Sequence, residues 1–254
     1  MQKAGGKVTL TVKPNLGYML DSLTYNYGTV TKQVPIVDGK YCFDMPEDYV
    51  TVNAEFKEIE YTISLEPNPV NAGTIEPGPS WKPELASLDH TFKMNDQRDV
   101  SVIPASEYSL REVSYTYKVD ENNSSEPVAL ENGGDRWIIP QMPAGNTTVT
   151  AYFWKLFNLT VAHENCAVQL LKFDPEGTQD EPTHTGSDPN YQVKNGVEVT
   201  VRLTPNSGFA LVSDPLTFTG DNNVTVTPLG GNKYSFIMPA QDVTMTATCL
   251  RVCF

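Results

Sequence analysis

The fold is decided by the stretch MPEDYVTVNAEF at residues 45–56, which occurs in related form three times along the chain. The second copy is MPAGNTTVTAYF at residues 142–153, and the third is MPAQDVTMTATC at residues 238–249. Successive copies lie about 100 residues apart, which is the size of a small domain and far longer than one turn of a solenoid. The chain is therefore predicted to consist of tandem domains rather than one core.

Within the first copy, Val50, Val52, Ala54 and Phe56 alternate with polar residues. This period of two is typical of a β-strand that buries one face. The other copies keep apolar residues in the same places: Val149, Ala151 and Phe153, then Val243, Met245, Ala247 and Cys249. Because proline lacks an N–H and has a fixed φ, each Met-Pro is predicted to be a corner between two strands. We expect the methionine at each corner (Met45, Met142 and Met238) to be buried.

Two further markers divide the chain into units. A marker that contains Pro precedes each copy, at residues 12–18, 102–108 and 203–209. In the first and third units this Pro ends an alternating strand, at residues 8–12 and 199–203. A third marker, at residues 61–65 and 157–161, opens the second and third units and has no counterpart before Val8. The first unit is therefore predicted to lack its opening strands. The predicted domains are a partial repeat at 1–58 and full repeats at 59–155 and 156–254.

The predicted fold class is all-β, with tandem small β-sheet domains that are β-sandwich or β-grasp-like. Neither junction, residues 56–61 or 153–157, contains Gly, Pro or Ser, so the linkers should have little conformational freedom. Apolar residues at these junctions, among them Ile59, Trp154 and Leu156, are expected to bury surface between neighbouring domains. The units are therefore predicted to stack end to end as an elongated rod.

The charge and hydrophobicity of the 254 residues exclude several classes of protein. A formal net charge of −13 argues against nucleic acid or an anionic membrane as partner, because both require clustered Lys and Arg. No apolar run approaches the roughly 18 residues of a membrane span, and residues 1–6 do not resemble a signal peptide. We expect the chain to be an excised piece of a longer protein, with any signal or anchor outside it.

The repeated residues carry a resemblance to a known family. VTLTVKPNLGY at residues 8–18, followed by YCFDMPEDYVTVNAEF at residues 41–56, resembles the divergent B-repeat family of bacterial surface proteins, which is related to the B-repeats of internalins. The second copy departs from the pattern at Glu107 and Pro140. The resemblance implies an extracellular all-β module, β-grasp-like in some relatives, that serves as a stalk, spacer or adhesion element without known catalysis.

Sequence patterns for catalysis and cofactors are missing. His90, His163 and His184 have no His or Cys neighbour at metal-ligand spacing, and no nucleophile-elbow, phosphate-loop or zinc-protease motif occurs. The acidic loop at residues 174–181 does not match a calcium-binding EF-hand and is interpreted as a solvated loop. We expect no catalytic residues, no metal and no cofactor. Cys42, Cys166 and Cys249 are predicted to be packing residues rather than ligands or nucleophiles. Cys249 and Cys253 lie four residues apart on one expected strand, too far apart to bond to each other.

Aromatic residues are the remaining candidates for a ligand site. Trp81, Trp137 and Trp154 are the weak candidates, because an exposed aromatic face suits sugar or apolar surfaces. The favoured function is a non-catalytic, monomeric region of a bacterial cell-surface protein that acts in adhesion or as a spacer. The alternative is a module that binds carbohydrate or a host protein through exposed aromatics or loops. The expected partner is thus a host or cell-surface protein or a glycan.

Overall fold

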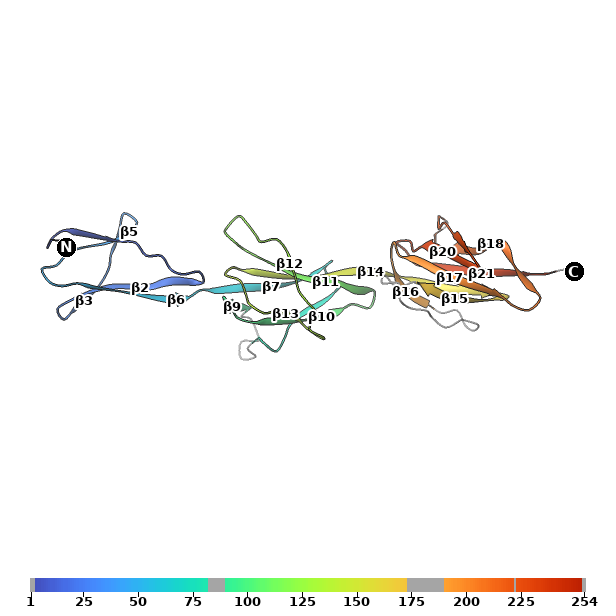
Figure 1. Ribbon diagram of the computed structural model, residues 1–254, viewed down its shortest axis with the longest axis horizontal. Coiled ribbons are helices and arrows are strands. Elements are labelled where there is room, and N and C mark those ends of the chain that lie inside the picture. Colours follow the sequence, from blue (N-terminus) through green and yellow to red (C-terminus); the bar gives the residue numbers. More distant parts are fainter. Residues whose placement is uncertain (1–2, 82–89, 173–189, 222, 253–254) are drawn as a thin grey trace. The chain divides into compact units, whose positions relative to one another are not determined.

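The computed structural model describes residues 3–81, 90–172, 190–221 and 223–252, and every regular element in these ranges is a β-strand (Figure 1). The predicted all-β class is therefore confirmed. The acidic loop at 174–181, His184 and Cys253 lie outside the described residues. The chain divides into two compact units, one made of residues 1–66, 75–102 and 113–151 and the other of residues 67–74, 103–112 and 152–254.

In the first unit, the first repeat forms two three-stranded sheets. One has the order β1-β5-β4 and the other the order β3-β2-β6, with antiparallel pairing throughout. Leu23, Tyr25, Val34 and Phe43 form its small core, and the ring centroids of Tyr25 and Phe43 stack 4.2 Å apart. The strands are β1 (Lys7–Leu10), β2 (Tyr18–Tyr27), β3 (Val30–Gln33), β4 (Ile36–Val37), β5 (Lys40–Asp44) and β6 (Thr51–Glu58).

The second repeat follows with eight strands. One sheet has the order β13-β10-β8, while β11 lies between β12 and β14, and β7 pairs with β14 and β9. Since β14 is one continuous strand, it closes the second repeat and opens the third, as the short junction predicts. The strands are β7 (Glu60–Asn68), β8 (Gly73–Pro77), β9 (Thr91–Lys93), β10 (Arg98–Pro104), β11 (Tyr108–Tyr117), β12 (Val128–Ala129), β13 (Trp137–Ile139) and β14 (Thr147–Glu164).

In the second unit, the third repeat has two four-stranded layers. One has the order β15-β17-β20-β19, and in the other β14 lies between β16 and β21, with β18 beyond β21. The two layers share one apolar core, to which β14, β17, β20 and β21 all contribute. This repeat is thus a β-sandwich. The strands are β15 (Cys166–Lys172), β16 (Asn190–Lys194), β17 (Glu198–Pro205), β18 (Phe209–Thr219), β19 (Thr227–Gly230), β20 (Lys233–Ile237) and β21 (Val243–Arg251).

Strand alternation in the second and third copies buries the predicted residues. Along β21, Met245, Ala247 and Cys249 are completely buried, and the intervening threonines lie on the other face. Val149 and Ala151 are equally buried in the second copy. At about 25 cal/mol per Å² of apolar area, the burial of these inward residues stabilises both repeats.

All three Met-Pro corners are held by the same pair of backbone hydrogen bonds. Met238 donates its N–H to Val197 O and accepts from Gly196 N–H, each at 2.8 Å. Met142 exchanges equivalent bonds with Asp96 and Asn95, and Met45 does so with Gly6 and Gly5. The residue that donates to the methionine has positive φ each time, 75° at Gly5, 70° at Asn95 and 80° at Gly196, which explains why Gly or Asn stands there. Burial of Met142 and Met238 is confirmed at 1% and 0% exposure, whereas Met45 is only half-buried.

The predicted burial of one face of the first copy is wrong. Every residue of β6 is exposed, and Val52 and Phe56 keep 40% and 43% of their surface. The reason lies in the neighbouring strands. On the side of β21 away from β18 lies β14, whereas among the described residues β6 pairs with β2 alone. Since no strand of the described ranges stands in the places of β14 and β15, the apolar face of β6 is exposed.

Candidate functional site

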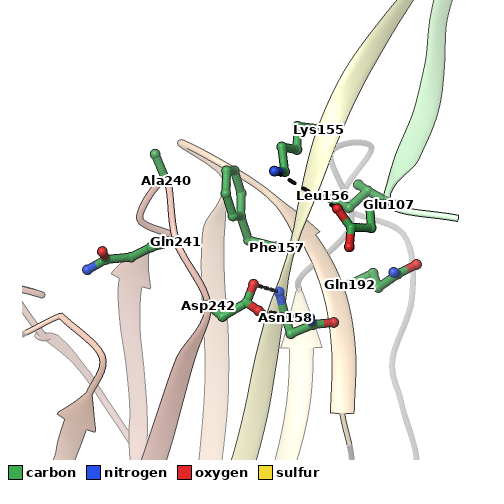
Figure 2. Close-up of a pocket in the computed structure, with 9 residues that line it drawn as sticks. All are labelled: Glu107, Lys155, Leu156, Phe157, Asn158, Gln192, Ala240, Gln241 and Asp242. Atoms are coloured by element: carbon green, nitrogen blue, oxygen red, sulfur yellow. Dashed lines mark hydrogen bonds and ion pairs between the residues drawn. The ribbon is translucent and has the colours of Figure 1, made fainter. Parts of the chain in front are cut away.

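The described residues of the second unit form a shallow polar depression beside the start of the third repeat (Figure 2). Its floor is the β14 segment from Lys155 to Asn158. Glu107 and Gln192 lie on one side, and residues 240–242, which follow the third Met-Pro corner, lie on the other. Phe157 is the one aromatic side chain in this lining, so hydrogen-bonding groups dominate the surface.

Asp242 and Asn158 are joined by two hydrogen bonds across this depression (Figure 2). Asn158 donates its backbone N–H to Asp242 Oδ1 at 2.8 Å and its side-chain amide to Oδ2 at 3.0 Å. These two donors, backbone first, lower the pKa of the Asp242 carboxyl from 3.8. The second repeat has the same contact, in which Thr62 N–H donates to Asn146 Oδ1 at 2.9 Å. The contact thus fastens the opening strand of a repeat to the start of its closing strand.

Replacing Asp242 with Ala should lower the free energy of unfolding at neutral pH by about 0.5–1 kcal/mol, since the carboxylate is solvent-exposed. The pKa of this acid is lower in the folded state than in the unfolded state. Its contribution is therefore complete above the usual value of 3.8 and disappears as pH falls through the folded-state pKa. Urea titrations of both proteins at several pH values check this, and a difference that persists at about pH 2 would contradict it.

The junction residues themselves are hydrogen-bonded rather than free. Leu156 donates its backbone N–H to Glu107 O at 2.8 Å, and Lys155 lies 3.9 Å from the Glu107 carboxylate and 5.6 Å from the ring centroid of Phe157. Equivalent backbone bonds, from Ile59 to Gly17 O and from Val252 to Gly208 O, occur in the other repeats. This hydrogen bond uses only the backbone carbonyl of its acceptor. It is therefore still formed in the second repeat, where Glu107 takes the place of Gly17 and Gly208.

Trp154, the most exposed of the three tryptophan candidates, is already covered by cations. It is 42% exposed, with the Arg111 guanidinium 4.8 Å and the Lys194 ammonium 5.3 Å from its ring centroid. Such cation–π contacts use the electron-rich ring face that a sugar would also need. The expected packing of Trp154 between domains stays a prediction.

Trp81 and Trp137 make structural contacts within the first unit. Trp81 donates its indole N–H to Asp99 O at 2.6 Å and meets the His90 ring edge-on at 5.3 Å. Trp137 lies in β13 and pairs with Val100 of β10. Both rings are half-buried. The Asp99 carboxylate, which accepts hydrogen bonds from Ser80 and Arg136, is the buried acid at the centre of this cluster.

The cysteines behave as packing residues where the structure describes them. Cys42, Cys166 and Cys249 are free thiols with 4%, 2% and 0% exposure, as predicted. Burial, together with the neighbouring Cys249 thiol, raises the pKa of Cys166 to about 12. Cys166 Sγ also contacts Ala247 O at 3.5 Å. A buried thiol with so high a pKa carries almost no thiolate at neutral pH and is a poor nucleophile.

In the folded protein, Cys42, Cys166 and Cys249 should therefore react very slowly with iodoacetamide at about pH 8. In denaturing urea all three should be alkylated quickly, because burial is lost. Peptide mass spectrometry after timed alkylation distinguishes the individual cysteines. Rapid modification of Cys166 without denaturant would show that the third core opens readily or that the thiol is not buried.

Within the described ranges, no group of three His, Cys, Asp or Glu side chains could hold a metal ion. The same residues contain no helix of the length and hydrophobicity needed to cross a membrane. Within the depression Asn158 is paired with Asp242 and Lys155 with Glu107, while Gln192 and Gln241 donate to the carbonyls of Ser106 and Gly220 beside it. These contacts suit a structural role better than a reactive centre.

β-sheet layers recur along the chain, and so do the hydrogen bonds at the Met-Pro corners and between opening and closing strands. These features define the class of all-β proteins built from tandem repeats. The chain belongs to the divergent InlB B-repeat domain family, whose model matches residues 1–60 and 178–251. The family resemblance seen in the sequence is thus confirmed. No curated protein matches the chain.

Solved structures with weak similarity include two bacterial proteins. The pilus adhesin SpaC of Lactobacillus rhamnosus GG, in an open conformation, is 10% identical, with a TM-score of 0.29. The match covers 98% of this chain and 44% of SpaC, so the chain spans less than half the length of that protein. An adhesin from Mobiluncus mulieris, which contains intramolecular disulfide, isopeptide and ester cross-links, is 12% identical over 78% of this chain and 77% of its own, with a TM-score of 0.32.

Proposed function

We propose that this chain is a non-catalytic, extracellular module of a bacterial surface protein that acts as a spacer in adhesion. Membership of the divergent B-repeat family and the net charge of −13 support a surface location. The observation that carries the spacer role is the hydrogen-bonded junction at Leu156, where β14 continues without a flexible linker. We also propose domain boundaries at residues 58/59 and 155/156.

A spacer works by holding its ends apart, so the proposal predicts a semi-rigid, elongated monomer in solution. Small-angle X-ray scattering of the full chain should give a maximum dimension well above that of a compact protein of the same mass, with a narrow distribution of shapes. A variant with a Gly-Ser insertion after Lys155 is the matched control, because a flexible linker should broaden that distribution. A compact particle, or an ensemble that is already broad without the insertion, would reject the spacer role.

The second candidate function, a carbohydrate- or host-protein-binding module, depends on Trp154, the candidate with the most exposed ring. A glycan array probed with the full chain tests the carbohydrate form of this idea. Reproducible binding that Trp154→Ala abolishes, with Trp137→Ala as the control, would favour the binding module. The cations that cover Trp154 lead us to expect no such binding.

A further inference from the structure

Two cysteines from opposite layers meet in the third repeat. Cys166 is the first residue of β15, and Cys249 lies near the end of β21, so each belongs to a different layer of the sandwich. Cys166 Sγ contacts Ala247 O at 3.5 Å, and Asn165 donates its side-chain amide to Cys249 O at 3.4 Å. These two contacts hold the start of β15 against the end of β21.

The two thiols are neighbours inside the apolar core. Cys166 and Cys249 are 2% and 0% exposed, and both belong to the core of this repeat. Burial first, and then a hydrogen bond with the Cys249 thiol, raises the pKa of Cys166 to about 12. A disulfide requires two cysteine side chains that approach each other at short range, and the contact between these thiols indicates such an arrangement.

The cysteine at the start of β15 takes the place of a glycine in the second repeat. Gly73 is the first residue of β8, as Cys166 is of β15. The residue before each accepts a backbone hydrogen bond from the residue after the Pro that ends the neighbouring strand. These bonds run from Ala105 to Ala72 O at 2.9 Å and from Asn206 to Asn165 O at 3.0 Å. Gly73 and Cys166 are therefore structurally equivalent.

The partner of this position differs between the two repeats as well. Phe153 stands in the second repeat where Cys249 stands in the third, and a Cβ added at Gly73 would lie only 2.7 Å from Phe153 Cζ. The glycine thus leaves room for the ring. In the third repeat Cys249 is much smaller than phenylalanine, and Cys166 supplies volume from the opposite layer. A Gly with Phe pair has become a Cys with Cys pair, so both positions differ together.

We propose that Cys166 and Cys249 form a disulfide bond that joins the two layers of the third repeat. The supply of an oxidant rests on the extracellular location proposed above, because disulfides persist in oxidising surroundings. The oxidant is itself a disulfide, either a small molecule or an oxidoreductase. One cysteine thiolate attacks it and releases its first thiol, and the second thiolate attacks the mixed disulfide and releases the other. The two cysteines lose two protons and two electrons, and the oxidant is reduced to two thiols.

The bond forms while the repeat folds, since the thiols of the folded chain are buried and almost fully protonated. It closes a loop of about 80 residues, which strongly restricts the unfolded chain. It also ties β15, at the start of the repeat, to β21, which ends it. The two layers of the sandwich can then no longer separate completely.

The test refolds the full chain from urea with reduced and oxidised glutathione, and then alkylates it in urea. Trypsin places Cys42, Cys166, Cys249 and Cys253 in four separate peptides, because Lys or Arg stands between each pair. Mass spectrometry should find peptide 156–172 joined to peptide 234–251, with the loss of two hydrogens. Cys42 and Cys253 should be alkylated. In the chain kept reduced, all four cysteines should be alkylated in urea.

Hydrogen exchange measures what the bond does to the folded repeat. In the oxidised chain, the most protected amides of β17 and β21 should exchange at least about 100-fold more slowly than in the chain reduced with dithiothreitol. Cys42→Ala and Cys253→Ala are the controls, and both should keep the linked peptide and the slow exchange. Cys166→Ala should lose the linked peptide, and dithiothreitol should leave its exchange unchanged. The comparison of oxidised and reduced unmodified chain holds even if that variant folds poorly.

The proposal is overturned if all four cysteines are alkylated after refolding, or if another pair is joined. It is also overturned if the oxidised and reduced chains exchange equally. Because the refolding buffer supplies its own oxidant, these outcomes reject the cysteine pair and not the surface location. The spacer role is tested separately by scattering, so either proposal can fail without the other.

Discussion

Replacing Met142 with Ala lowers the stability of the second repeat by about 2–4 kcal/mol, because a side chain with 1% exposure leaves a cavity that the rigid corner cannot close. The backbone bonds to Asn95 and Asp96 keep the corner in place when the side chain is shortened. Since several repeats unfold in one chain, a single unfolding transition would not isolate this effect. Native-state hydrogen exchange at Val149 and Ala151, next to the corner, measures it locally.

The matched control for this prediction is Met45→Ala in the first repeat. Met45 has the same backbone contacts, but its side chain is half-buried, so the loss should be about 1 kcal/mol. The comparison separates side-chain burial from the hydrogen bonds of the corner. A loss below about 0.5 kcal/mol for Met142→Ala would mean that the Met-Pro corner is a surface turn.

Replacing Met245 with Asp unfolds the third repeat. Met245 is completely buried at the centre of the sandwich, so an aspartate there must either remain charged in an apolar core or be protonated at a cost. The expected loss exceeds about 4 kcal/mol, which is a large part of the stability of a small domain. Limited proteolysis and hydrogen exchange of β17 and β21 should report the unfolded repeat.

Val52→Asp is the equivalent substitution in the first repeat, and it should cost less than about 1 kcal/mol because Val52 is 40% exposed. The two variants differ in the surroundings of the residue and not in its place within the repeat. Similar losses at Met245 and Val52 would contradict the exposed face of β6.

Local features of the sequence were sufficient to predict the strand that follows each Met-Pro corner. Alternation of apolar and polar residues located β6, β14 and β21, and proline after methionine located the corner before each. The alternation and the Met-Pro pair each involve residues close together in the sequence, so both can be recognised without a structure. The family could be recognised for the same reason, because its pattern consists of strand and turn residues in a preserved order.

Contacts between distant residues could not be read in the same way. The bond from Asn158 to Asp242 joins positions 84 residues apart, and the sequence alone marks neither as a partner of the other. Its counterpart between Thr62 and Asn146 has the same separation, which comparison of the repeats could have revealed. The paired cations at Trp154 were also missed, since Arg111 and Lys194 meet that ring only in the folded chain.

The sequence by itself therefore determined the all-β class, the threefold repeat and the position of each Met-Pro corner. Only the tertiary structure decided which repeated faces are buried. Val52 and Met245 stand at the same place in the same pattern, yet one is 40% exposed and the other completely buried. The physical reason is that alternation depends on the chain's own backbone geometry, whereas burial depends on neighbouring strands. β21 lies between β14 and β18, while in the part of the chain that the structure describes β6 has β2 as its one neighbour.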